Sequence, residues 1–139
     1  MGGADDLMSA AGVFLDTNAL LFFLVRPARL TPAARQAIAV APDLSVSAAS
    51  LWEVATKYRI GKLPEASPLF AAGTLVHALA GAGVHVVPVN GYDAETAGSV
   101  PAAHGDPFDR MIAAHAARLG VPLVSNDAAL DAFGVTRIW

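Results

Sequence analysis

Residues 13–25 read VFLDTNALLFFLV, and this stretch decides which class of fold the sequence predicts. Its first part, residues 13–16, is a short apolar run suited to a strand that is buried on both faces. Asp16 ends that run, and residues 18–25 are expected to form the helix that follows it. A buried strand that leads directly into a helix indicates a sheet whose faces are covered by helices.

The rest of the chain repeats this alternation. Further short apolar strands are predicted at residues 44–46, 84–89, 122–125 and 135–138. Helices are expected over residues 32–40, 48–61, 67–80, 92–99, 107–119 and 127–133. Strands that alternate with helices indicate βαβ units, so the predicted fold is a three-layer α/β/α sandwich with a central, mainly parallel sheet.

The length and composition indicate one domain. The 139 residues can bury a single core, which we place over residues 12–139, and residues 1–11 are expected to form a flexible tail. The chain has no cysteine, which excludes disulfides and thiolate metal sites. The net charge of −3 argues against non-specific coating of nucleic acid by charge alone.

The longest stretch without charged residues, residues 66–92, resembles a membrane span only at first sight. Glycine, histidine and proline interrupt it, and its pattern changes from helix to strand. The first residues carry acids and no lysine or arginine, so they do not resemble a secretory signal. We therefore expect a cytoplasmic protein without a membrane contact.

Four acids are expected to meet at one edge of the sheet. Asp16 ends the first strand, and Glu53 lies near the second turn of the helix after the second strand. Asp109 lies in the first turn of the helix at residues 107–119, and Asp127 comes just after the fourth strand. In parallel sheets, sites form at the carboxyl ends of the strands, and right-handed crossovers bring such positions together.

Each acid taken alone also has an ordinary structural interpretation. Asp16 and Asp127 could cap helices, Glu53 could pair with Lys57 four residues later, and Asp109 could interact with a helix dipole. The four together are different, because like charges crowded at one edge are destabilising unless protons or cations neutralise them.

Oxygen ligands of this kind suit Mg²⁺ or Mn²⁺, one or two ions per site. We expect Asp16 and Asp109 to be the most direct ligands, with Glu53 and Asp127 binding directly or through water. The chemistry indicated is metal-assisted hydrolysis of a phosphodiester. Thr17, Asn18 and Ser125 lie where they could orient the ligands or a metal-bound water.

Four sequence blocks contain the acids. They are Leu15-Asp16-Thr17-Asn18-Ala19-Leu20, Val46-Ser47-Ala48-Ala49-Ser50-Leu51-Trp52-Glu53-Val54, His104-Gly105-Asp106-Pro107-Phe108-Asp109-Arg110-Met111-Ile112 and Leu123-Val124-Ser125-Asn126-Asp127. In this order they resemble the successive blocks of PIN-domain proteins, most closely the VapC-type toxins of bacterial toxin–antitoxin pairs.

The resemblance implies an endoribonuclease that depends on magnesium or manganese, is often dimeric, and is silenced by a small VapB-like antitoxin. It assigns the acidic quartet to Asp16, Glu53, Asp109 and Asp127. Asp106 is the rival for the third place. We prefer Asp109 because it lies close before an Ile-Ala-Ala stretch that is typical of the family, and we expect Asp106 to cap the helix.

Basic and aromatic residues near the acids have two interpretations each. Lys57, Arg59 and Lys62 could contact RNA phosphates or simply solvate the surface. Arg110 could contact the substrate or brace an acid. His104 could orient its loop or take a direct part in catalysis, whereas the histidines at 77, 85 and 115 are expected to be structural. Trp52 and Phe108 lie in apolar helical patterns and are expected in the core rather than as stacking platforms.

Other metal-dependent enzymes and nucleotide-binding folds fit the residues less well. A phosphatase with an aspartyl nucleophile would need an acid two residues after Asp16, where Asn18 stands. The glycine-rich motif of a dinucleotide-binding fold is missing after the first strand. The alternative that stays open is a catalytically inactive PIN-like module that binds an antitoxin or RNA without cutting it.

Overall fold

The computed structural model describes residues 12–139, and the tail expected over residues 1–11 lies outside this range. A five-stranded sheet with the order β3-β2-β1-β4-β5 forms its centre. The strands are β1 (Val13–Leu15), β2 (Leu44–Ser47), β3 (Val84–Val87), β4 (Leu123–Val124) and β5 (Arg137–Ile138). All of their pairings are parallel, so the predicted parallel sheet is confirmed.

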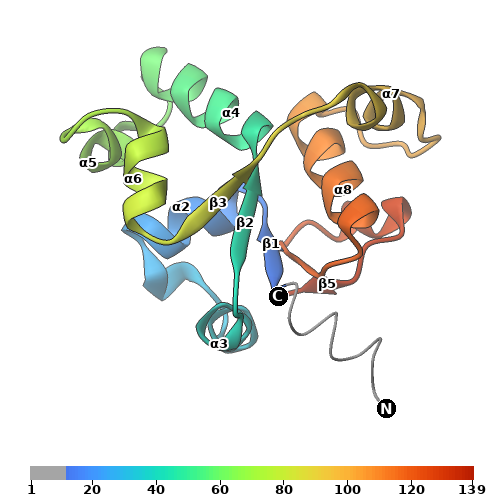
Figure 1. The fold of residues 1–139 in the computed structure, drawn as a ribbon, viewed down its shortest axis with the longest axis horizontal. Coiled ribbons are helices and arrows are strands. Elements are labelled where there is room, and N and C mark those ends of the chain that lie inside the picture. The colour runs from blue at the N-terminus through green and yellow to red at the C-terminus, as the bar shows by residue number, and fades with distance from the viewer. Residues whose placement is uncertain (1–11) are drawn as a thin grey trace.

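Helices cover both faces of this sheet. In Figure 1, α7 and α8 lie on one side of the strands, whereas α2, α5 and α6 lie on the other. The α-helices are α2 (Thr17–Val25), α3 (Pro32–Val40), α4 (Ala48–Arg59), α5 (Ser67–Phe70), α6 (Leu75–Gly81), α7 (Gly91–Ser99) and α8 (Pro107–Leu119). Short 3-10 helices form η1 (Pro27–Arg29), η2 (Pro64–Ala66) and η3 (Ala128–Phe133). This is the α/β/α sandwich that the sequence predicts.

The alternation of side chains along β1 divides the core into two parts. Val13 and Leu15 join the apolar cluster that includes α2, α4 and α6, with Leu20 as one of its buried members. Phe14 points to the opposite face and packs with Ile112 of α8. Burying each side chain of this size contributes about 1.5–3 kcal/mol, so the continuous apolar run of β1 fixes both helical layers against the sheet.

The segment 67–80 differs from its prediction as one helix. The structure divides it into α5 and α6, with a turn between them. Gly73 has a φ of 140°, a conformation that ends a helix, and the Thr74 hydroxyl accepts a hydrogen bond from the His77 amide to begin the next one. The uncharged run therefore contains two short helices and β3, and in the described part of the chain no helix is long and apolar enough to cross a membrane.

Candidate active site

The four predicted acids lie at the carboxyl edge of the sheet. Asp16 follows β1 directly, and Asp127 comes after β4, a strand that pairs with β1. Glu53 comes from the second turn of α4, which continues β2, and Asp109 from the first turn of α8. Of the four, Asp109 and Asp127 lie within ligand distance of one another, together with His104. Glu53 and Asp127 are near enough to Asp16, and Glu53 and Asp16 near enough to Asp109, for their charges to raise the pKa of that aspartate.

Among the aspartates of this site, Asp16 is the most deeply buried, with 5% of its surface exposed. Its Oδ1 accepts a hydrogen bond of 2.7 Å from the Ala19 amide, so it also caps α2. Burial raises the pKa of Asp16 to about 6, and the charges of Glu53 and Asp127 act in the same direction, while a hydrogen bond with Ser125 opposes them. When Asp16 is ionised, its negative charge is therefore not balanced by the groups around it.

Glu53 is buried, and both of its oxygens have partners. The Thr17 hydroxyl donates to Oε1 at 2.5 Å and lies 3.0 Å from the Ser50 hydroxyl. Lys57 Nζ lies 2.6 Å from Oε2. The hydrogen bond to Glu53 is the largest cause that raises the pKa of Lys57, and the charges of Asp106 and Asp109 add to it. Lys57 thus provides a positive charge to the edge where the acids meet.

His104 joins Asp109 and Asp127 in one cluster. Its Nε2 lies 2.7 Å from Asp127 Oδ2 and 3.4 Å from Asp109 Oδ2. One ligand atom of each of the three residues lies within 4.8 Å of the other two, which is close enough for a shared cation. From the sequence, His104 is expected to orient its loop, with a direct role in catalysis as the alternative, and the structure places its ring beside both carboxylates.

Asp109 carries the second strongly shifted pKa of the site. Burial raises the pKa of Asp109 to about 6, and the charges of Asp106 and Glu53 raise it further, whereas His104 lowers it. Asp106 caps α8, as predicted, because its Oδ1 accepts hydrogen bonds from the amides of Phe108 and Asp109. Capping thus uses Asp106 and leaves the Asp109 carboxylate facing the cluster.

The residues expected to orient the acids behave differently. Thr17 donates to Glu53, and the Ser125 hydroxyl, which interacts with Asp16, accepts a hydrogen bond of 3.1 Å from the Asp127 amide. Asn18 is exposed and lines a surface pocket together with Asn126. Thr17 and Ser125 therefore support the acids directly, whereas Asn18 faces outward beside them.

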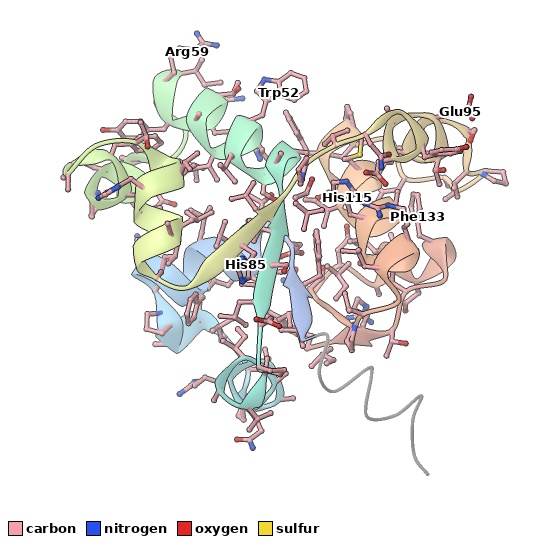
Figure 2. All side chains as sticks on the ribbon, in the orientation of Figure 1. Trp52, Arg59, His85, Glu95, His115 and Phe133 are labelled. Carbon is pink, nitrogen blue, oxygen red and sulfur yellow. The ribbon has the colours of Figure 1, made fainter. Side chains whose placement is uncertain are left out.

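The basic residues near the acids separate into two groups. Lys57 reaches the acids, whereas Arg59 and Lys62 are exposed at and beyond the end of α4, where Figure 2 shows Arg59 far from the sheet. Arg110 points into the protein: it donates to the backbone carbonyls of Ala97, Val100, Ala102 and His104, at 2.5–2.9 Å. Arg110 therefore holds the loop that carries His104, and the partners it braces are backbone carbonyls rather than the acid that the sequence suggested.

A separate buried charge network joins α7 to α8. His115, which is completely buried, lies 2.8 Å from Asp93 through its Nε2, and Arg118 Nε lies 2.5 Å from the same carboxylate. Burial acts to raise the pKa of Asp93, but the hydrogen bonds from Arg118, the Asn90 backbone and His115 outweigh it and lower that pKa overall. His115 is therefore structural, as expected.

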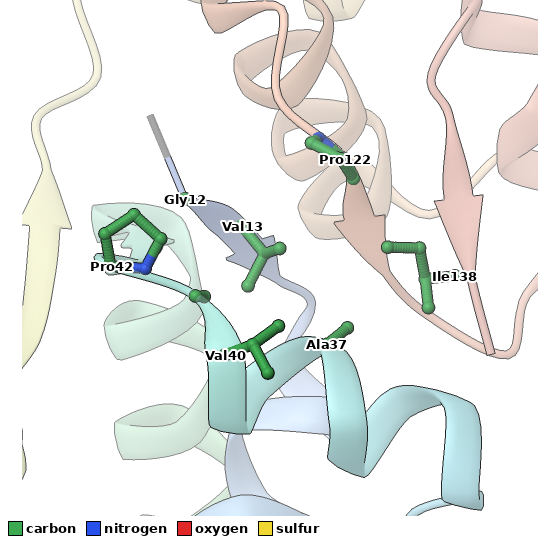
Figure 3. A pocket seen from close by; sticks show the side chains of 8 residues that line it. Gly12, Val13, Ala37, Val40, Pro42, Pro122 and Ile138 are labelled. Atoms are coloured by element: carbon green, nitrogen blue, oxygen red, sulfur yellow. The ribbon is translucent and has the colours of Figure 1, made fainter. Parts of the chain in front are cut away.

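The apolar pocket in Figure 3 lies at the other edge of the sheet. Gly12, Val13 and Pro42 line it where β1 and β2 begin, and Pro122 lines it just before β4. None of the four acids lines this pocket, so it lies apart from the edge where the acids are found.

These observations define a class of protein: a parallel α/β domain with carboxylates gathered where its central strands end. The profile of the PIN domain matches residues 13–135, and the chain belongs to the PIN-domain family. A comparison with curated proteins gives no match.

Solved structures show the same fold at low sequence identity. The FitAB complex bound to an IR36 DNA fragment gives a TM-score of 0.55 at 17% identity, over 90% of this chain and 92% of that one. VapBC2 from Rickettsia felis, bound to a DNA fragment from its promoter, gives 0.64 at 14%, over 90% and 96%. FitAcB from Neisseria gonorrhoeae gives 0.60 at 18%, over 90% and 95%.

Proposed function

We propose that this protein is a metal-dependent endoribonuclease that hydrolyses RNA phosphodiester bonds, with Mg²⁺ or Mn²⁺ as its cofactor. The observation that carries this proposal is the group of His104, Asp109 and Asp127, whose ligand atoms lie within 4.8 Å of one another. Burial and neighbouring negative charge, which raise the pKa values of Asp16 and Asp109 to about 6, support it. Such a cluster requires a counter-charge when it is ionised, and a divalent cation supplies one.

The possible ligand atoms are carboxylate oxygens and one histidine nitrogen, a set that fits a hard divalent cation able to accept a nitrogen ligand. Asp109 and Asp127 would hold the ion, with His104 as a neighbouring ligand or hydrogen-bond donor, and Asp16 would face the same ion from the end of β1. When bound, the cation stabilises charge on the phosphate oxygens and makes water more acidic. One or two ions per site are consistent with the number of carboxylates.

The chain's own residues would fix the geometry of this reaction. Thr17 and Lys57 hold both oxygens of Glu53, so Glu53 acts on the site from a fixed position, directly or through water. The charged amine of Lys57, although paired with Glu53, would add to the attraction for a phosphate, as would Arg59 and Lys62 farther along. Arg110 would contribute through the His104 loop rather than through substrate.

The biological role proposed is that of a toxin in a type II toxin–antitoxin pair in the cytoplasm. Membership of the PIN-domain family supports this role, and the similar structures come from VapBC and FitAB complexes bound to DNA or from FitAcB. A small VapB-like antitoxin is the partner expected, and a homodimer is the expected assembly.

Cleavage of RNA by the purified protein tests the proposal. We expect labelled single-stranded RNA to be cut with Mn²⁺ or Mg²⁺ and to stay intact with EDTA. Asp16→Asn should lower the rate by orders of magnitude, because its amide keeps the α2 cap but removes the charge. Asp131→Asn is the matched control, since Asp131 is exposed and pairs with Arg137. Intact RNA after incubation of the wild type with manganese would support a binding module instead.

A further inference from the structure

Trp52 is largely exposed, contrary to its prediction as a core residue. It lies in α4 with 68% of its surface accessible, next in sequence to the buried Glu53. Successive side chains in a helix point about 100° apart, so the helix turns Glu53 towards the acids and Trp52 out to solvent. Figure 2 shows the indole ring standing clear of α4. An exposed indole gives up the stabilisation that burial would provide, which makes its position notable.

Phe108 holds this indole in place. The two ring centroids lie 5.1 Å apart with an angle of 78° between the ring planes, an edge-to-face contact. Phe108 directly precedes Asp109, as Trp52 directly precedes Glu53. The aromatic pair therefore joins α4 and α8, the two helices that carry Glu53 and Asp109. The same two helices fix the position of the pair relative to these acids.

We propose that Trp52 stacks against an unpaired nucleobase of the RNA strand next to the phosphate being cut. This proposal rests on the ribonuclease function proposed above, and it adds the contact that would position the strand. A base offers a flat π-face whatever its sequence, whereas a base inside a duplex is already stacked on its neighbours. The expected ligand is therefore single-stranded RNA.

The charge of the site favours this kind of contact. The carboxylates repel the phosphate backbone, and Lys57, the cation that reaches them, is already paired with Glu53. An uncharged aromatic surface adds affinity for the strand without bringing more charge to the acids. In the described part of the chain, Tyr92 is the other strongly exposed aromatic residue, and it lies on α7, which carries none of the four acids.

Fluorescence of Trp52 reports on stacking directly. The chain has two tryptophans, so Trp139→Phe leaves Trp52 as the single emitter, and Asp16→Asn in the same protein prevents cleavage. We expect short single-stranded RNA to quench this emission in a saturable way, and a duplex or an oligomer of abasic ribose phosphates to quench it much less. Equal quenching by the abasic oligomer would overturn the proposal, since it would place only backbone at Trp52.

Binding and cleavage by variants supply the second arm. Trp52→Ala should weaken binding of single-stranded RNA by roughly 5- to 150-fold, the range that corresponds to about 1–3 kcal/mol for a stacked base. Trp52→Phe should keep part of that affinity, and Tyr92→Ala should keep all of it. In the active protein, Trp52→Ala should raise KM far more than it lowers kcat.

The outcomes separate this proposal from the one on which it rests. If wild-type protein cuts RNA and Trp52→Ala binds it with unchanged affinity, the stacking proposal is wrong and the ribonuclease stands. If RNA quenches Trp52 but no metal supports cleavage, base stacking stands and the ribonuclease is wrong. If a protein partner changes the fluorescence of Trp52 and RNA does not, the stacking proposal is also wrong.

Discussion

Lys57 Nζ lies 2.6 Å from Glu53 Oε2, and this ion pair places a cation of the chain itself among the acids. Lys57→Met removes that charge and leaves Glu53 buried with Thr17 as its remaining partner. We expect the metal-free protein to lose about 1–3 kcal/mol of stability, between the values for exposed and buried pairs. Because the acids then lack a counter-charge, Mn²⁺ should stabilise Lys57→Met more than the wild type.

Thermal unfolding with and without Mn²⁺ measures both effects. Arg59→Met is the matched control, since Arg59 is an exposed base on the same helix. If both variants unfold alike and respond alike to manganese, Lys57 has no special relationship with the acids.

The stability of the metal-free protein should depend on pH through Asp16 and Asp109. Both have a pKa near 6 in the fold, raised from 3.8. Between these values the folded chain holds more protons than the unfolded chain, so stability falls as pH rises from about 4 to about 7 and then levels off. The loss is at most on the order of 3 kcal/mol for each group.

Urea unfolding at several pH values, in the presence of EDTA, measures this dependence. Asp16→Asn should flatten the curve and make the metal-free protein more stable than the wild type at pH 7.5. If the stability of the wild type is constant or increases from pH 5 to pH 7, the pKa values of the two carboxyl groups are not raised as described.

Arg110 should affect the site through the loop that it holds. Lysine cannot donate to the four carbonyls that Arg110 reaches, one of which is that of His104. We expect Arg110→Lys to cost about 2–3 kcal/mol of stability. It should also weaken Mn²⁺ binding, because His104 would lose its position beside Asp109 and Asp127.

Calorimetry at a temperature where Arg110→Lys stays folded measures the metal affinity. Arg118→Lys removes part of the Asp93 network, away from the acids, and serves as the control with a stability loss but normal metal binding. Equal metal affinity in wild type and Arg110→Lys would restrict Arg110 to a role in stability.

Gly12 is required where β1 begins. Its φ is 83°, and a Cβ there would lie 2.0 Å from the Asp43 carbonyl oxygen, so a side chain needs the backbone to move. Gly83 has a φ of 75° with open space around it. We expect Gly83→Ala to cost about 1–2 kcal/mol, from backbone conformation alone, and Gly12→Ala clearly more. Chemical denaturation compares the two, and equal losses would contradict the close approach.

Most of the fold could be predicted because its elements have local signals. The apolar run of residues 13–16 and the caps at Thr31, Ser47 and Asp106 all lie within a few residues of the elements that they define. The segment 67–80 was predicted wrongly because Gly73 is tolerated in a helical pattern, and only its left-handed φ ends the helix.

The site could be predicted in part. The rule for parallel sheets is sufficient to bring Asp16 and Asp127 to one edge, since it needs only the strand ends. The position of His104 depends on a loop held by Arg110, and no spacing in the sequence encodes that contact. Trp52 was placed in the core because periodicity identifies apolar faces but does not show which face remains without a partner.

Direct measurement of Mn²⁺ binding tests the central claim, that the gathered carboxylates hold a divalent cation. Titration calorimetry at pH 7.5 should show one or two equivalents bound by the wild type and by Asp131→Asn. Asp109→Asn and Asp127→Asn should each weaken binding at least about tenfold, since each removes a charged ligand of the same ion. The account would be contradicted if the wild type bound no Mn²⁺, or if both amide variants bound it as tightly as the wild type does.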